Sequence, residues 1–142
     1  MQSYITDLNL VDLISEKHAK LRKMVRDKWV EAGEEYITDT ESYMLALLER
    51  EPMTVAQLAR KIDISRQGAH KCAKGLISRD YILVENIEGN SRDKALILTD
   101  KGHRFCEETL IIKKKIENDI KSSIDEDELA LLRKYLSKTW FK

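Results

Sequence analysis

Residues 54–102 constrain the fold most, because they place helical patterns, a strand pattern and turn residues in a definite order. Apolar side chains at intervals of three and four predict two short helices, over about 54–62 and 65–79. A tight turn over 63–65 separates them, and Ser65 is a favourable residue for the N-cap of the second helix. This order predicts a helix-turn-helix.

A β-hairpin is expected directly after the two helices. β-Branched and apolar residues predict a strand over 81–87 and a return strand over 95–98, joined by the polar loop 88–93. Arg92 lies in this loop, which is poorly suited to a core. Arginine is favoured in a narrow minor groove, where the negative potential is enhanced. An incidental arginine on a surface hairpin is the alternative interpretation.

The outward positions of the second helix carry side chains that can read or hold DNA. Arginine pairs well with guanine and glutamine with adenine in the major groove, while lysine suits phosphates. A solvated helix with ordinary surface charge is the other interpretation, and the helix by itself does not decide between them. Helix and hairpin together favour double-stranded DNA as the partner. The candidate DNA-binding residues are Ser65, Arg66, Gln67, His70, Lys71, Lys74, Arg92 and Lys94.

The charge of residues 54–94 supports DNA as the partner, although the charge of the whole chain does not. The whole chain has 25 basic and 25 acidic residues, and a net charge of zero argues mildly against nucleic acid. Residues 54–94, however, carry eight Lys/Arg and five Asp/Glu, a net charge of +3, while residues 1–53 are at −4. Because local charge governs phosphate contact, the predicted helix-turn-helix and hairpin form the basic part of a neutral protein.

Amphipathic helices are expected on both sides of this segment. Apolar residues at helical spacing predict helices over about 7–32, 40–50 and 99–120, and the residues 125–128 predict a capping box that opens a last helix. A first helix of about 25 residues would be about 37 Å long, more than a small core covers, which indicates a partner chain. The fold class expected is mostly α with a small β-hairpin (α+β). The apolar face of the last helix is predicted to consist of Leu129, Leu132, Leu136 and Trp140.

Composition excludes several classes of protein. A chain of 142 residues, 42% hydrophobic and 35% charged, suits a helix-rich globular domain and is too apolar for a disordered one. No apolar run approaches about 20 residues, and the N-terminus lacks a signal-peptide pattern, so we expect a cytoplasmic protein. The sequence has no phosphate-binding glycine loop and no nucleophile elbow, so we expect neither an enzyme nor a cofactor.

The cysteines and histidines leave two further chemistries open. Cys72 and Cys106 are interpreted as buried structural thiols, with oxidant sensing as the alternative. His103 and Cys106 are one helical turn apart, and His18 could approach from another helix, which is a weak signal for a metal site. A hydrogen-bonded histidine on the apolar face of the first helix is the simpler interpretation of His18.

The same residues resemble the MarR family of winged-helix transcription regulators over essentially the whole chain. The family pattern is Asp-x-Arg followed by Leu-Thr-x-x-Gly. It is matched by residues 90–92, with Asn90 in place of the aspartate, and by residues 98–102 at the family spacing. The turn and recognition helix over 64–70 also resemble the family's. Further departures from the family pattern are Asp63, Gly68 and Asp80.

The resemblance implies a single MarR-like domain over residues 1–142. It implies a winged helix-turn-helix over about 40–100 and dimerisation helices over about 5–33 and 100–141. It further implies a homodimer that binds a palindromic operator, acts as a repressor and responds to a small-molecule effector at an unknown site. The alternative of a different class is a winged helix that serves as a protein-interaction module without specific DNA binding. Candidates for an effector cleft, or equally for packing, are Trp29, Tyr36 and Tyr43.

Overall fold

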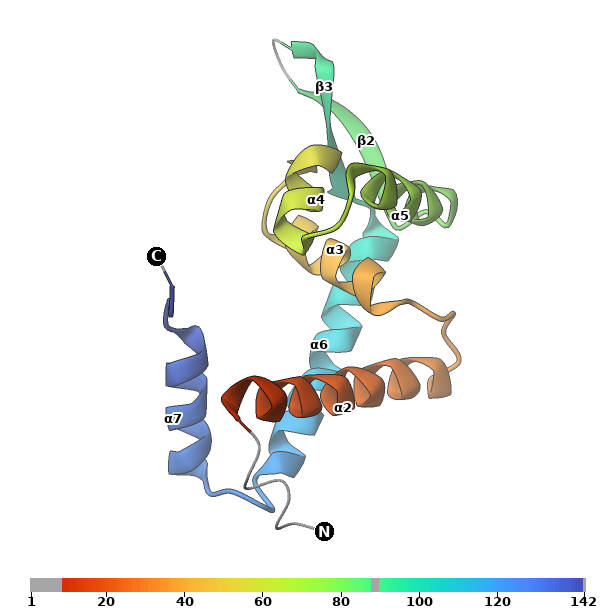
Figure 1. Ribbon diagram of the computed structural model, residues 1–142. Helices are drawn as coiled ribbons and strands as arrows, with labels where there is room; N and C mark the ends of the chain where they lie inside the picture. Colours follow the sequence, from red (N-terminus) through yellow and green to blue (C-terminus); the bar gives the residue numbers. More distant parts are fainter. Residues whose placement is uncertain (1–8, 88–89, 142) are drawn as a thin grey trace.

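The helices and strands of the described chain form a winged helix with long helices beneath it (Figure 1).

 The computed structural model describes residues 9–87 and 90–141, and of residues 87 and 90–93 it describes the backbone alone. In chain order the elements are α2 (Leu10–Glu31), α3 (Asp39–Arg50), β1 (Met53–Thr54), α4 (Val55–Ile62), α5 (Arg66–Ser78), β2 (Ile82–Ile87), β3 (Asn90–Leu98), α6 (Asp100–Ile120) and α7 (Glu126–Ser137). The expected fold class, mostly α with a small sheet, is confirmed.

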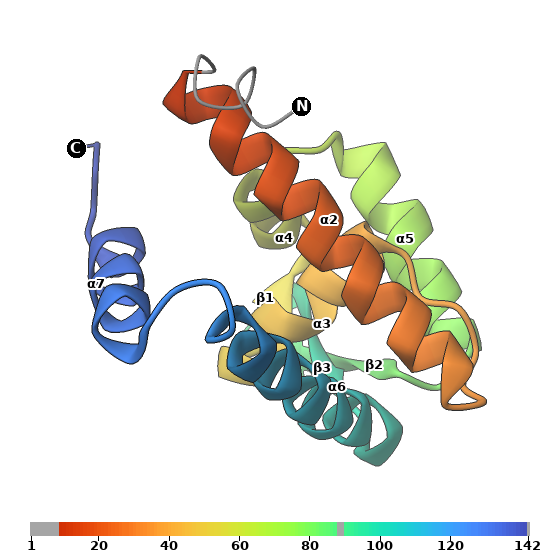
Figure 2. The same ribbon diagram turned by 90° about the horizontal axis from the view of Figure 1, so that it is seen from below.

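The elements divide the molecule into two ends. The β2–β3 hairpin projects from one end, with α3, α4 and α5 packed around its base (Figure 1). Helix α2 lies across the other end, and α6 runs from the hairpin base past α2. The two helices cross in Figure 1, and the view from below shows α7 standing apart to one side (Figure 2). The long helices therefore form a layer of their own beneath the winged helix.

The sheet has three antiparallel strands in the order β1-β3-β2. Two predictions about it were wrong. Strand β1 was not expected, because two residues carry no periodic signal; its pairing of Met53 with Leu96 depends on a distant partner. The return strand begins at Asn90 rather than at residue 95, so the predicted polar loop over 88–93 is too long. Asn90 pairs with Ile87 and Lys94 with Asn86 of β2, with a register irregularity between the two pairs.

Side-chain caps set most helix boundaries, as the sequence indicated. Ser65 and Thr99 accept hydrogen bonds from backbone N–H groups at the starts of α5 and α6. Asp125 forms the expected capping box with Glu128. Helix α3 begins at Asp39 behind the N-cap Thr38, one residue before the predicted start.

Both ends of the chain also differ from the prediction. Helix α2 begins at Leu10 behind the N-cap Asn9, and the predicted start near residue 7 lies outside the described residues. Helix α7 ends at Ser137, so Trp140 does not continue its apolar face. The Trp140 indole instead donates to the Tyr135 carbonyl oxygen at 2.8 Å, which turns the chain back on the last helical turn.

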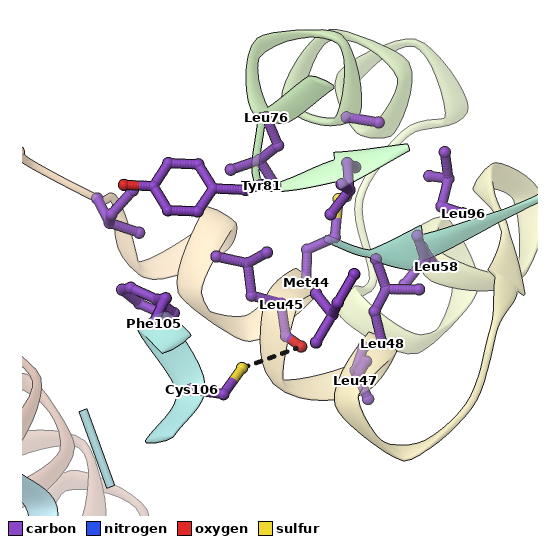
Figure 3. Close-up of a cluster of buried hydrophobic side chains, with 14 of the residues drawn as sticks. Met44, Leu45, Leu47, Leu48, Leu58, Leu76, Tyr81, Leu96, Phe105 and Cys106 are labelled. Carbon is purple, nitrogen blue, oxygen red and sulfur yellow. Dashed lines mark hydrogen bonds between the residues drawn. The ribbon is translucent and has the colours of Figure 1, made fainter. Parts of the chain in front are cut away.

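One hydrophobic core joins the helices of the winged helix to the sheet (Figure 3). Met44, Leu58 and Leu76 have no exposed surface and come from three different helices. Phe105 of α6 extends this core toward α2, since its ring meets that of Trp29 edge-on with centroids 5.0 Å apart. Trp29 is therefore a packing residue, in agreement with one of its two predicted roles.

The helical arms leave much of their apolar surface uncovered. We use this name for α2, the second half of α6 (residues 110–120) and α7. No residue of α7 is buried within the single chain. An apolar groove of about 440 Å³ lies between α2, α6 and α7, and its walls include Leu21, Ile116, Leu132 and Leu136. Across the described residues, no helix is both long enough and apolar enough to pass through a bilayer.

Candidate nucleic-acid interface

Helix α5 is held in place by the turn that precedes it. Asp63 adopts a left-handed conformation (φ 63°, ψ 52°), which ends α4 and begins the turn. The Ser65 hydroxyl then accepts a hydrogen bond from the Gly68 N–H at 3.0 Å. Ser65 therefore caps α5, and its predicted role in DNA contact stays a prediction.

Small residues allow α4 and α5 to cross closely. Ala59 and Ala69 are both buried, and Ala73 and Leu76 continue the inward face of α5. Cys72, predicted to face inward as well, is half-buried at the margin of the core. With this face fixed against the core, the opposite face of α5 must point to solvent.

The predicted reading residues share that solvent face. Their side chains lie on the first three turns of α5, the part of a recognition helix that can enter a major groove. No protein group within the described residues accepts a hydrogen bond or an ion pair from them, so their donors remain available. The exposed residues of this face are Arg66, Gln67, His70, Lys71 and Lys74.

A hollow of about 640 Å³ separates this face of α5 from the sheet. Arg66, His70 and Lys74 line it from α5, and Lys94 lines it from β3. Its floor is apolar and includes Leu96. The hollow thus has a cationic rim over an apolar base, which suits the sugar-phosphate backbone of one DNA strand.

Arg92 is the remaining predicted contact. Its backbone belongs to β3, in the projecting hairpin of Figure 1, but its side chain lies outside the described residues. Asp80, one of the departures from the family pattern, adopts a positive φ of 67° between α5 and β2. Its carbonyl oxygen accepts a hydrogen bond from the Thr99 hydroxyl, so the base of the hairpin is tied to the start of α6.

Comparisons with known proteins agree with this geometry. A family model described as the MarR family matches residues 37–92, which include both helices of the helix-turn-helix and most of the hairpin. The chain belongs to the MarR family. It is thus a DNA-binding transcription regulator and not an enzyme.

Individual relatives extend the match of this MarR-family chain to the arms. The Staphylococcus aureus regulator TcaR is 25% identical over 129 residues, which are 89% of this chain and 83% of TcaR. The reduced form of MarR from Escherichia coli superposes with a TM-score of 0.78 at 16% identity, covering 94% of this chain and 98% of that one. A Mycobacterium tuberculosis MarR family protein in complex with salicylic acid superposes with a TM-score of 0.71 at 18% identity, covering 91% and 94%.

The cysteines of this MarR-family chain lie in settings that oppose reactivity. Burial raises the pKa of the Cys106 thiol to about 12, and its Sγ contacts the Leu45 carbonyl oxygen at 3.7 Å (Figure 3). Burial also raises the pKa of Cys72 to about 11. Both thiols are therefore protonated at neutral pH, which favours the structural interpretation over oxidant sensing.

Metal binding has no structural support in the described part of the chain, where no three His, Cys, Asp or Glu side chains form a ligand group. Cys106 is buried while His103 is exposed, so the two do not present a common site. His18 is exposed on α2 in the single chain, and its predicted hydrogen bond remains a prediction for an assembled dimer. Tyr36 and Tyr43 are each about half exposed and are free to contact another molecule.

Sequence analysis missed the residues that fix the linker between α2 and α3. Arg79, at the end of α5, pairs with Glu41 of α3 across 38 positions of sequence. Lys101 of α6 pairs with Glu35 of the linker at 3.3 Å. Periodicity and motifs carry no signal for such pairs, because each partner is an ordinary charged residue in its own element.

Proposed function

We propose that this regulator is a ligand-responsive repressor that binds a palindromic operator as a homodimer in the cytoplasm. The observation that carries the proposal is the exposed row from Arg66 to Lys74 on α5, with Lys94 across the hollow. This row offers both base-reading and phosphate-binding groups on one face. Repression is chosen over activation because it is the behaviour implied by the family resemblance.

The dimer follows from the uncovered surface of the arms. Leu132 and Leu136 of α7 are 44% and 54% exposed, and with the apolar walls of the groove they form a surface that one chain leaves open to water. We propose that a second copy covers it, through the helices over about 5–33 and 100–141. A twofold dimer presents two α5 helices to half-sites about 10 base pairs apart.

The effector is proposed to be a small anionic aromatic molecule. The support is indirect: a relative of the same fold is named for its complex with salicylic acid. Within this chain, the mostly apolar groove beside α7 carries three cationic side chains, Arg22, Lys113 and Arg133, and one carboxylate, Glu117. Burial and the neighbouring Arg22 charge lower the pKa of Lys113, and an anion bound beside these two cations would offset their mutual repulsion.

The deciding experiment is selection of DNA by the purified protein, followed by titration of binding against salt. We expect a palindromic consensus and an affinity that falls steeply as salt rises, since several Lys and Arg displace counterions. Arg92→Ala is expected to weaken binding without lowering the melting temperature. If no duplex shows salt-sensitive binding, the protein-interaction module becomes the better description.

A further inference from the structure

The linker between α2 and α3 is the sole direct chain connection from the first arm to the winged helix. Gly33, with φ +90°, ends α2, and the following five residues belong to neither helix nor strand. Such a segment would ordinarily allow the two ends of the molecule to change their relative angle. Here side chains from α2, α5 and α6 all bind it.

Arg79, at the end of α5, makes three contacts, one of them with the linker. Its guanidinium pairs with the Glu41 carboxylate and donates to the Tyr36 carbonyl oxygen at 3.4 Å. Its Nε also donates to the Gly75 carbonyl oxygen at 3.2 Å, within α5 itself. One side chain therefore joins the last turn of α5 to both the linker and the first turn of α3.

Glu35 receives the contacts from the other side. Trp29 of α2 donates its indole N–H to the Glu35 carbonyl oxygen at 3.0 Å, and Lys101 of α6 reaches the carboxylate. Lys101 also donates to the Arg79 carbonyl oxygen at 2.8 Å and lies 4.4 Å from the centre of the Tyr81 ring. A hydrogen bond from Tyr81, opposed by burial and assisted by Lys101, lowers the pKa of Glu35, so its carboxylate stays charged.

We propose that these four charged residues, Glu35, Glu41, Arg79 and Lys101, form a linker clasp that sets the angle of α5 relative to α2. The inference rests on the proposed function, because that angle fixes the distance between the two recognition helices of a dimer. Arg79 and Glu41 are then positioning residues for half-site spacing, although neither is placed on the DNA-facing row. The Glu41 side chain is only 13% exposed, so its partner is not readily replaced by water.

Glu41→Gln is the cleanest test. Glu41 also completes the capping box of α3 by accepting a hydrogen bond from the Thr38 N–H at 2.9 Å. Glutamine serves the same capping role, so the substitution removes the charge and keeps the cap. Lys23→Gln is the matched control, because Lys23 also loses an ion pair, with Asp27, but that pair lies within α2 and away from the linker.

The measurement is affinity for duplexes that carry two selected half-sites centred about 10 base pairs apart, with the spacing varied in single-base-pair steps. Wild type and K23Q are expected to prefer one spacing. E41Q and R79Q are each expected to bind that spacing about tenfold more weakly, with a flatter profile and unchanged affinity for a non-specific duplex. The double variant is expected to lose little more than either single one, since both act through one pair.

The possible failures are distinct. A lower melting temperature with an unchanged spacing profile in E41Q would overturn the clasp and leave it as ordinary packing, whatever happens to R79Q. An equal loss of affinity for the selected and the non-specific duplex would also overturn the clasp. A positioning role should instead lower the ratio of specific to non-specific affinity. If wild type itself binds no duplex, both the proposed function and the clasp are wrong.

Discussion

Leu58 of α4 has no exposed surface, whereas Leu136 of α7 is about half exposed in the same chain. The contrast extends to their surroundings, since the winged helix encloses its own core and the arms present an open groove. The winged helix can therefore fold on the apolar contacts within one chain. The arms hold comparable leucines at helical spacing but require a second surface to bury them.

The largest expected effect comes from the same substitution made in each region. Leu58→Ala is expected to destabilise the protein by about 2–5 kcal/mol at every protein concentration, because it leaves a cavity in a closed core. Leu136→Ala is expected to leave the single chain almost unaffected and to weaken the dimer. Melting curves and sedimentation measured over a range of concentrations distinguish the two.

A loss of stability in Leu136→Ala that does not depend on protein concentration would contradict the contrast between the arms and the winged helix. It would mean that α7 already packs within one chain. A Leu58→Ala variant that melts at the same temperature as wild type would also contradict this contrast, because it would show that the core of the winged helix tolerates a cavity.

The thiols offer a second test of the closed core. With its pKa near 12 instead of 9, the Cys106 thiol is expected to react with an alkylating reagent about a thousandfold more slowly than an exposed thiol. Ser123→Cys places a matched thiol in the exposed turn between α6 and α7, and we expect it to react at an ordinary rate. Fast alkylation of Cys106 in the folded protein at neutral pH would show that the core opens.

The pKa values also predict how stability depends on pH. The pKa of each cysteine is higher in the folded state than in the unfolded chain, so their contribution is complete below pH 9 and is lost as pH rises toward 11 and 12. Melting temperatures at pH 8 and at higher pH measure this loss of stability. Stability that is unchanged at alkaline pH would contradict the assignment.

A substitution at the contact between α2 and α3 is expected to have a smaller effect on stability. Asp39, at the start of α3, accepts from Arg26 of α2 at 2.6 Å and lies 3.5 Å from Arg22. Burial opposes ionisation of Asp39, but the Arg26 hydrogen bond and both positive charges outweigh it and lower its pKa. Asp39→Asn is expected to cost about 1 kcal/mol at neutral pH, as the carboxylate is partly exposed.

The sign of the pH dependence makes this prediction specific. A lowered pKa means that the stabilisation is present above the ordinary value of 3.8 and is lost as pH falls through the folded-state value. The difference between wild type and Asp39→Asn should therefore vanish in strong acid. Asp27→Asn is the control, since its ion pair with Lys23 is exposed and confined to α2; an equal loss there would show that Asp39 does not join the two regions.

The sequence predicted the features that depend on neighbouring residues, and missed those that depend on distant residues or on a second chain. The cap at Ser65 and the capping box over residues 125–128 were predicted, because each depends on residues close in sequence. Strand β1 and the pairing of Arg79 with Glu41 depend on partners about 40 positions away, where a single sequence carries no signal. The exposed face of α7 was predicted to be apolar, yet what covers it is a property of the assembly and not of one chain.

The smallest expected effect concerns one phosphate contact. Lys74 is exposed at the rim of the hollow beside α5, whereas Lys115 is exposed on α6 in the arms. Lys74→Gln is expected to lower affinity about equally for all sequences and to reduce the slope of log affinity against log salt by about one. Lys115→Gln removes the same charge from the other region and should leave the slope unchanged. Equal slopes for the two variants would mean that net charge alone, and not the placement of Lys74 on the winged helix, governs the electrostatic part of binding.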